Sequence, residues 1–250
     1  MPIRNLRVMV AIVVSCALAT ATWADDTQYR VHYRLVNNSA TLPKKIVVIP
    51  AGVKVFEVTA GGVQEEVPDW SAEATDSVLK SVSAAISKGA SMQEILMPRL
   101  PAADAAIVDE HMALYKLVVN TASDIDLKHK LGHFDYSIGP GLATLLGRTG
   151  ADAAVLIYGR DYASTAGRKT KAVLGKIPII NIFTGDDVQL GHSFIHIGLV
   201  DLKTGDLLWM NSEYRGGSSN LRDQKDAQNI VDAIFKLYPG IEQYRRAYAN

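Results

Sequence analysis

One stretch of this sequence has the residue types of a hydrolase nucleophile. Gly191-His192-Ser193 matches the start of the motif Gly-x-Ser-x-Gly, in which the serine lies on a sharp turn between a strand and a helix. The position of the second glycine holds Ile195, and the following residues have the pattern of a strand. We interpret Ser193 as a strand residue and predict no catalytic residue. The alternative is a hydrolase that uses Ser193 with a His/Asp set assembled by the fold.

Two histidine pairs have the spacing of a shared metal site on a helix. They are His129 with His133 and His192 with His196. In a strand the second pair would be about 13 Å apart, which is too far for one ion. The first pair is flanked by lysines and lacks the intervening glutamate of zinc proteases. We therefore predict no metal site.

Glycine-rich and acidic segments could hold phosphate or a cation. Gly139-Pro140-Gly141 opens a predicted helix, but Leu142 stands where a phosphate-binding loop needs lysine. Asp186-Asp187 has no partner carboxylate at an interpretable spacing and is interpreted as a solvated loop. We predict no cofactor.

A basic cluster is interpreted as a solvated face, or as a contact for anionic lipid or a partner: Arg160, Arg168, Lys169 and Lys171.

The first 24 residues have the architecture of a secretory signal peptide. A basic start is followed by an apolar run from Val8 that is shorter than the ~20 residues of a spanning helix. Thr22-Trp23-Ala24 fits cleavage before Asp25. The alternative is a lipobox ending at Cys16, which would make the chain an outer-membrane lipoprotein anchored there. We predict export to the periplasm, and no transmembrane span after Asp25.

Composition and charge bound the class of the exported part. The chain has 250 residues, of which 48% are hydrophobic and 21% charged, as in an ordinary globular protein. Cys16 is its one cysteine, so the exported body has neither a disulfide nor a thiol nucleophile. Loss of Arg4 and Arg7 with the signal peptide leaves 24 of the 26 basic residues against 26 acidic ones. This balance excludes a strong phosphate-binding field, and we predict no nucleic-acid partner.

Strand and helix patterns alternate along the rest of the chain. Residues 25–43 are predicted to form a polar lead-in arm with a weak strand over Tyr29–Leu35, and residues 44–250 an α/β domain. Further strands are predicted at Ile46–Ile49, from Val53, at Val63–Val67 beyond the Gly61-Gly62 turn, and at Ala153–Tyr158. A late hairpin is predicted with arms Leu199–Asp201 and Leu207–Trp209 and a positive φ at Gly205.

Helices are predicted between these strands. The first covers Trp70–Lys88 behind an Asp69 N-cap, with Val78, Val82, Ala85 and Ile86 inward. The second covers Ala102–Asn120, with Ile107, Leu114, Leu117 and Val118 inward. A third follows Pro140, with Leu142, Leu145 and Leu146 on its apolar face and Gly150 at its end. The last runs from near Asn220 to about Leu237 and places Ala227, Ile230, Val231 and Ile234 inward.

Because strands and helices are interspersed, we predict a single-domain α/β fold with a mixed β-sheet flanked by helices. Two segments also carry a family resemblance: the stretch from Phe134 to Lys169, which contains "GADAAVL" and the pair Gly167-Arg168, and the hairpin "LVDLKTGDLLW". Together they resemble a group of uncharacterised proteobacterial exported proteins, over roughly residues 44–237. More remotely, they resemble the periplasmic α/β domain of curli-secretion lipoproteins and the amino-terminal domain of the Tol-Pal periplasmic component.

The resemblance implies an anticodon-binding-domain-like fold and a part in envelope assembly, transport or interaction. It supplies no catalytic residues. We expect a non-catalytic interaction or assembly module of the bacterial cell envelope. Its expected partner is another envelope protein or a second copy, with peripheral or lipid-anchored membrane contact as a further expectation. A soluble periplasmic small-molecule binder is a second alternative, and it would need an apolar pocket.

Overall fold

The strands of the protein form one mixed sheet. The structure is a computed structural model that describes residues 28–32, 34–35, 42–49, 52–59, 61–89, 92–124, 134–164, 191–217 and 219–240. Its strands are β1 (Gln28–Val31), β2 (Lys45–Val48), β3 (Val53–Val58), β4 (Gln64–Glu66), β5 (Gln93–Ile95), β6 (Ala153–Ser164), β7 (His192–Asp201) and β8 (Leu207–Gly216). The main order is β1-β8-β7-β6-β2-β5, and β3 and β4 continue the sheet beside the far half of β6.

The sheet mixes parallel and antiparallel pairing around β6. β2 and β3 pair with β6 in parallel and follow one another along the same edge of it, and β7 pairs with the other edge in antiparallel register. The parallel pairs are joined through helices, and the antiparallel pair β7–β8 is joined by a tight turn. The predicted α/β fold with a mixed sheet and flanking helices is therefore confirmed.

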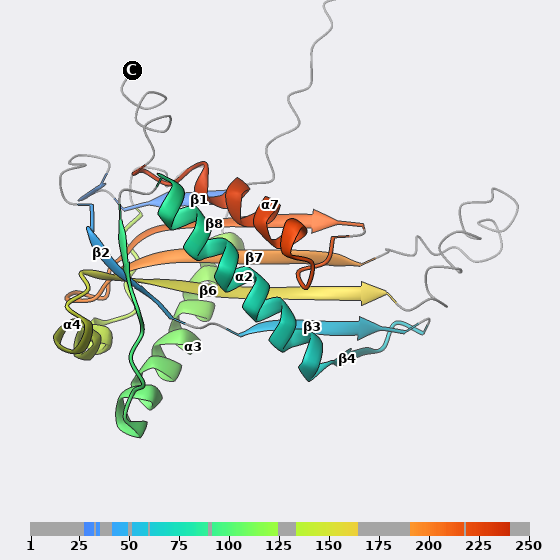
Figure 1. Ribbon diagram of the computed structural model, residues 1–250, viewed down its shortest axis with the longest axis horizontal. Helices are drawn as coiled ribbons and strands as arrows, with labels where there is room; N and C mark the ends of the chain where they lie inside the picture. The colour runs from blue at the N-terminus through green and yellow to red at the C-terminus, as the bar shows by residue number, and fades with distance from the viewer. Residues whose placement is uncertain are drawn as a thin grey trace, which may run out of the picture.

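Helices cover the two faces of the sheet unequally (Figure 1). α2 (Pro68–Gly89) and α7 (Gln224–Phe235) pack against each other on one face, which we call the front. α3 (Ala102–Asp124) lies behind the sheet, near the end where β7 turns into β8, with the short η3 (Pro140–Leu142) and α4 (Ala143–Thr149). Among the described helices, none lies behind the far ends of β3, β6 and β8.

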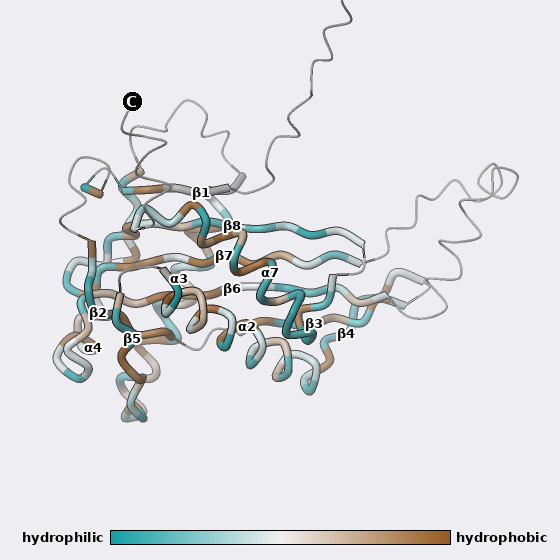
Figure 2. The backbone as a smooth tube through the Cα atoms, turned by 45° about the horizontal axis from the view of Figure 1, so that its top comes forward, coloured by the Kyte–Doolittle hydropathy of each residue, from teal (hydrophilic) through white to brown (hydrophobic). Residues whose placement is uncertain are grey.

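The core lies on both faces of the sheet: α2 and α7 pack on the front against β3 and β8, and Tyr115 and Val119 of α3 pack on the back. Figure 2 shows apolar colour in the half of β6–β8 next to the hairpin and paler to polar colour toward their far ends. On β7, alternate residues face the front helices, and Ile195 and Ile197 are fully buried there. α7 adds the predicted inward residues Ala227, Ile230, Val231 and Ile234, all of which are buried.

The late hairpin is confirmed, with longer arms than the prediction. β7 and β8 have ten residues each, and Gly205 has a φ of +76°. Asp201 fixes the turn because its Oδ1 accepts from the N–H groups of Lys203 and Thr204, at 2.8 and 3.1 Å. The strand after α4 is also longer than predicted, since β6 continues to Ser164.

Two predicted helix starts are wrong. α2 begins at Pro68, whose fixed φ suits the first helical position, so Asp69 lies in the first turn and is not the N-cap. α7 begins at Gln224, four residues after the predicted Asn220. Asp223 sets this start because its side chain accepts from the N–H groups of Lys225 and Asp226.

The predicted inward face of the second helix is also wrong. In α3, Leu114 and Leu117 are exposed, Leu117 at 64%, and Ile107 and Val118 are half-buried. The buried apolar row of α3 is instead another one: Val108, Met112, Tyr115, Val119 and Ala122. Tyr115 selects this face, since its ring fits against Gly198 of β7, where a Cβ atom would lie 2.6 Å from it.

Three smaller predictions need correction. Leu142 at the end of η3 and Leu145 in α4 are buried as predicted, but Leu146 is 36% exposed. The strand predicted over Tyr29–Leu35 ends at Val31, where the chain turns back and the Leu35 N–H bonds to the His32 carbonyl. The short edge strand β5 was not predicted. The predicted signal peptide at 1–24, with Cys16, lies outside the described residues.

Candidate functional site

Seven rings lie together on the back of the sheet, at the end far from the hairpin. We call this set the aromatic face: Phe56, Tyr158, Tyr162, His192, Phe194, His196 and Tyr214. They come from four adjacent strands, β3, β6, β7 and β8. Alternate residues of a strand point to the same side, and the pairing register brings these positions opposite one another. The alternation along each strand and the pairing register between strands together bring the seven rings to one face.

Four of the rings form a continuous row across the strands. Phe56 stacks on Tyr162 with centroids 5.3 Å apart, and Tyr162 stacks on His192 at 4.4 Å. His192 stacks in turn on Tyr214 at 5.5 Å. The interplanar angles are 17°, 28° and 29°, so each ring presents a face to its neighbour. The row therefore offers ring edges and polar tips to a partner, with ring faces free only at its ends.

A second cluster surrounds Tyr158, which lies four residues before Tyr162 on β6 and therefore closer to the hairpin. Its ring stacks on His196 at 6.0 Å and meets Phe194 edge-on at 5.8 Å. Arg160 lies between the row and this cluster: its Nη1 donates to the Tyr162 hydroxyl at 3.4 Å, and its Cζ is 5.8 Å from the Tyr158 centroid. From α3, the Lys116 Nζ lies 5.5 Å from the same centroid. Two cations thus approach one ring.

The two histidines of the face are neutral at pH 7. Burial lowers the pKa of His196 to about 4, and its Nδ1 has no hydrogen-bond partner among the described residues. Burial also lowers the pKa of His192, although the negative charge of Asp161 opposes this shift. The positive charge of the face therefore comes from Arg160 and Lys116.

The opposite side of the same strands carries a buried hydroxyl–carboxylate pair. The Ser193 Oγ donates to the Asp161 Oδ1 at 2.8 Å, and the Leu221 N–H donates to the Asp161 Oδ2 at 3.0 Å. Burial raises the pKa of Asp161, against the lowering effect of these two hydrogen bonds. The pair joins β6 and β7 to the loop that precedes α7, which is a structural role.

This geometry does not assemble the hydrolase alternative. Ser193 is 0% exposed and faces the front helices. His192, its neighbour in the strand, points to the back and lies between the rings of Tyr162 and Tyr214. Among the described residues, the Ser193 hydroxyl bonds to the Asp161 carboxylate and to a backbone carbonyl, and no histidine lies within hydrogen-bond distance of it.

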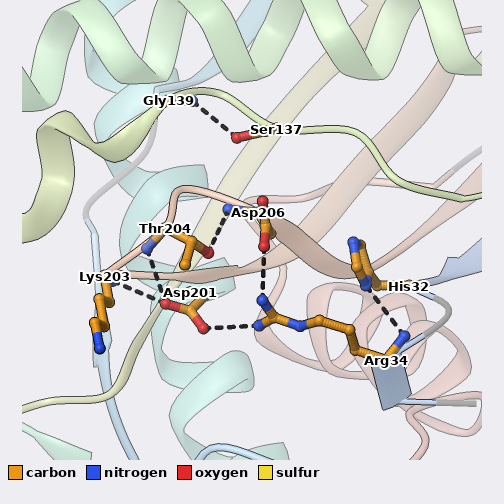
Figure 3. Close-up of polar contacts among 8 residues, drawn as sticks. All are labelled: His32, Arg34, Ser137, Gly139, Asp201, Lys203, Thr204 and Asp206. Atoms are coloured by element: carbon orange, nitrogen blue, oxygen red, sulfur yellow. Dashed lines mark hydrogen bonds and ion pairs between the residues drawn. The ribbon is translucent and has the colours of Figure 1, made fainter. Parts of the chain in front are cut away.

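The hairpin end of the sheet holds a contrasting polar cluster (Figure 3). Arg34 reaches both ends of the turn: its Nη2 bonds to Asp201 at 3.0 Å and its Nη1 to Asp206 at 2.8 Å. The Arg34 N–H donates to the Nδ1 of His32 at 3.2 Å. Burial lowers the pKa of His32. The cluster holds the arm after β1 against the hairpin, with one guanidinium shared by two carboxylates.

The remaining candidate residues of the sequence are dispersed. Gly139 is the N-cap of the 3-10 turn η3, Gly141 lies within this turn, and α4 after it has seven residues. His129, His133, Asp186, Asp187, Arg168, Lys169 and Lys171 lie outside the described residues. Within the described ranges, no group of three or more His, Cys, Asp or Glu side chains could hold a metal ion. In the same ranges, no helix has the length and apolarity needed to cross a membrane.

Sequence reasoning missed the aromatic face as a unit. It treated His192 and His196 as a metal-site question and Arg160 as part of a basic cluster. The usable signal was the alternation of ring-bearing positions, at 158 and 162 in one strand and at 192, 194 and 196 in the next. Their register decides whether they meet, and the register is set by pairing between segments far apart in the sequence.

Comparisons with known proteins found no matching family model and no matching curated protein. Solved structures of PelC from Paraburkholderia phytofirmans, described as dodecamers, are similar to this chain. One, a single-substitution variant, is 10% identical with a TM-score of 0.39, over 86% of this chain and 98% of that chain. The other is 13% identical with a TM-score of 0.36, over 86% and 96%. These values assign the chain to no family.

Proposed function

We propose that this protein is an exported, non-catalytic interaction or assembly module of the bacterial cell envelope, and that its partner binds the aromatic face. The observation that carries the proposal is the set of seven rings around Arg160, which α3 reaches only through Lys116 at Tyr158 and whose row Phe56–Tyr162–His192–Tyr214 lies toward the strand ends that no described helix covers. Interfaces are enriched in Tyr, Phe and Arg. Tyr214, at one end of the row, is 46% exposed.

Export is proposed from the leader sequence. Cleavage after Ala24 would release the chain from Asp25 into the periplasm, and lipidation at Cys16 would anchor it to the outer membrane. N-terminal sequencing of the protein purified from cell envelopes is expected to begin at Asp25. Incorporation of labelled palmitate that is lost in Cys16→Ser would establish the anchored form instead.

A non-catalytic role is supported by the placement of the groups most suited to chemistry. The Ser193 hydroxyl and the Asp161 carboxylate are both buried under the loop that precedes α7, so a substrate could reach them only after this loop moved away. Ser193→Ala is therefore expected to leave any activity of the protein toward ester, peptide or phosphate substrates unchanged. Turnover that disappears in this variant would support the hydrolase instead.

Photocrosslinking from the face tests the interaction directly. p-Benzoylphenylalanine replaces Tyr214 in the exported protein in living cells, and the matched control carries it at Asp76 of α2, an exposed position on the front. We expect an adduct of one defined mass from position 214 and none from position 76. Mass spectrometry then identifies the adduct as another envelope protein or as a second copy.

The adduct must also depend on the face itself. Phe194→Ala removes the ring beside Tyr158 and leaves the crosslinker at position 214, its cross-strand neighbour, in place; it is expected to weaken binding of the identified partner at least tenfold. Crosslinking that is equal from positions 214 and 76, or that Phe194→Ala leaves unchanged, would refute the aromatic face as the binding surface.

A further inference from the structure

Two cations of the aromatic face lack carboxylate partners among the described residues. Arg160 and Lys116 both lie within 6 Å of the Tyr158 centroid, and neither forms an ion pair there. Other cations at this end of the sheet are paired: Lys54 with Glu66 at 2.7 Å, and Arg215 with Glu213 at 2.5 Å on the front. The unpaired positive charge is thus local to Tyr158.

The surroundings of Arg160 make its unpaired positive charge unfavourable for the free energy of the folded chain. Its Nη1 is held by the Tyr162 hydroxyl, and its Nε is buried with no hydrogen-bond partner among the described residues. An oxygen anion would stabilise a half-buried guanidinium strongly. Aromatic neighbours lower the local dielectric constant, which strengthens the attraction between opposite charges, and charge-assisted hydrogen bonds are stronger than neutral ones. The site is complementary to a negative ligand.

We propose that the aromatic face binds a glutamate or aspartate side chain of an acidic polypeptide segment, and that Arg160 and Lys116 hold its carboxylate. This inference rests on the proposed function and names the chemistry of the partner. Arg160 presents planar donors, which suit the two oxygens of a carboxylate, and Lys116 adds a point charge from α3. Phe194 and the methylene groups of the acidic side chain would make the apolar contact.

The ring geometry favours a polypeptide over a lipid surface. Rings of the row stand face to face and present their edges, which carry the positive side of the ring quadrupole and attract oxygen. Tyr158 and Tyr162 are recessed, at 6% and 9% exposure, so they cannot insert into a bilayer. A side chain that reaches down between them can contact Arg160, which a flat membrane surface cannot.

Calorimetric titration with a capped hexaglutamate peptide tests the proposal on the exported protein. We expect Arg160→Gln and Lys116→Gln each to weaken binding by about tenfold, because each removes one charge-assisted contact. The matched control Arg215→Gln removes one positive charge at the same end of the sheet but on the front. It is expected to change the affinity by less than about twofold.

Several outcomes would overturn the proposal. They are no binding of hexaglutamate, equal weakening by all three variants, and tighter Arg160-dependent binding of inorganic phosphate or of phosphatidylglycerol vesicles. If Arg160→Gln does not fold, Arg160→Lys tests the same point, because it keeps the charge and loses the planar donors. A position-214 adduct without hexaglutamate binding refutes only the carboxylate chemistry. Loss of both results refutes the interaction surface as well.

Discussion

The two ends of strands β6 and β7 are built on opposite electrostatic principles. At the hairpin end, Arg34 bonds both turn carboxylates, Asp201 and Asp206, and the segment before η3 closes on the turn by backbone hydrogen bonds. At the aromatic end, Arg160 and Lys116 have no carboxylate among the described residues. The Arg34 cluster pairs the turn carboxylates within the fold, and the aromatic end retains positive charge and ring edges that a partner could satisfy.

The comparison separates stability from binding. A polar group left without a partner at a half-buried site costs free energy in the folded chain, so it is retained where another molecule completes it. The hairpin end has no such group in its Asp201–Arg34–Asp206 cluster. We therefore expect mutations at the hairpin end to act on folding, and mutations of the exposed part of the aromatic end to act on partner binding.

Gly205→Ala should give the largest loss of stability. Gly205 has a φ of +76°, and an added Cβ atom would lie 1.9 Å from the Gly139 carbonyl oxygen, which belongs to a rigid backbone. The turn or the 136–139 segment must then move, and the hydrogen bond from Ile138 N–H to the Gly205 carbonyl is lost. We expect the free energy of unfolding in urea to fall by about 4 kcal/mol.

The control for this substitution is Gly147→Ala. Gly147 lies in α4, and a Cβ atom there would meet no atom within 4 Å. Because alanine favours the helix, this variant is expected to be as stable as the wild type or up to about 1 kcal/mol more stable. Equal effects of the two substitutions would show that the hairpin end is not tightly fixed.

Stability at the aromatic end should depend on pH through His196. Its pKa is about 4 in the folded protein and 6.5 in an ordinary histidine, so between these values the unfolded chain binds a proton that the folded chain does not. This contribution is complete above pH 6.5 and is lost as the pH falls toward 4. Between pH 7 and pH 4.5 it should lower the free energy of unfolding by about 2 kcal/mol.

His196→Phe isolates this contribution. The variant keeps a ring beside Tyr158 and removes the titrating group, so urea unfolding across this pH range should show a shallower loss on acidification than the wild type. Asp161 acts with the opposite sign, because its raised pKa gives stability that is lost as the pH rises, but it is present in both proteins. Parallel curves for the two proteins would contradict the neutral, buried state of His196.

Local signals predicted the hairpin end well. Asp201, Thr204 and Gly205 form a turn through contacts within a few residues, so the sequence contains nearly all of the information. The apolar patterns of β6 and α7 are also local and predicted both elements, although the Asp223 cap and the extension of β6 to Ser164 were missed. The helix α3 was not, because apolar residues on two of its sides leave the period ambiguous, and Gly198 of a distant strand selects the face.

The aromatic end depends on long-range register, which no local pattern contains. Tyr162 meets His192, and Phe56 meets Tyr162, only because β3, β6 and β7 pair in the observed register. A slip of one residue would send every one of these rings to the front. The ring-bearing positions could be read from the sequence, whereas their convergence with Arg160 and Lys116 required the fold.

Tyr214→Ser should have the smallest effect on stability. Tyr214 is 46% exposed at one end of the ring row and touches only His192 among the described rings, so its loss should cost about 0.5 kcal/mol in urea unfolding. Tyr162→Ser, in the middle of the row, is the contrast. Its ring lies between Phe56 and His192, and its hydroxyl accepts from Arg160, so we expect a loss of about 3 kcal/mol. A large effect at position 214 would mean that the row is a structural element along its whole length, and the division between a folding end and a binding end would then fail.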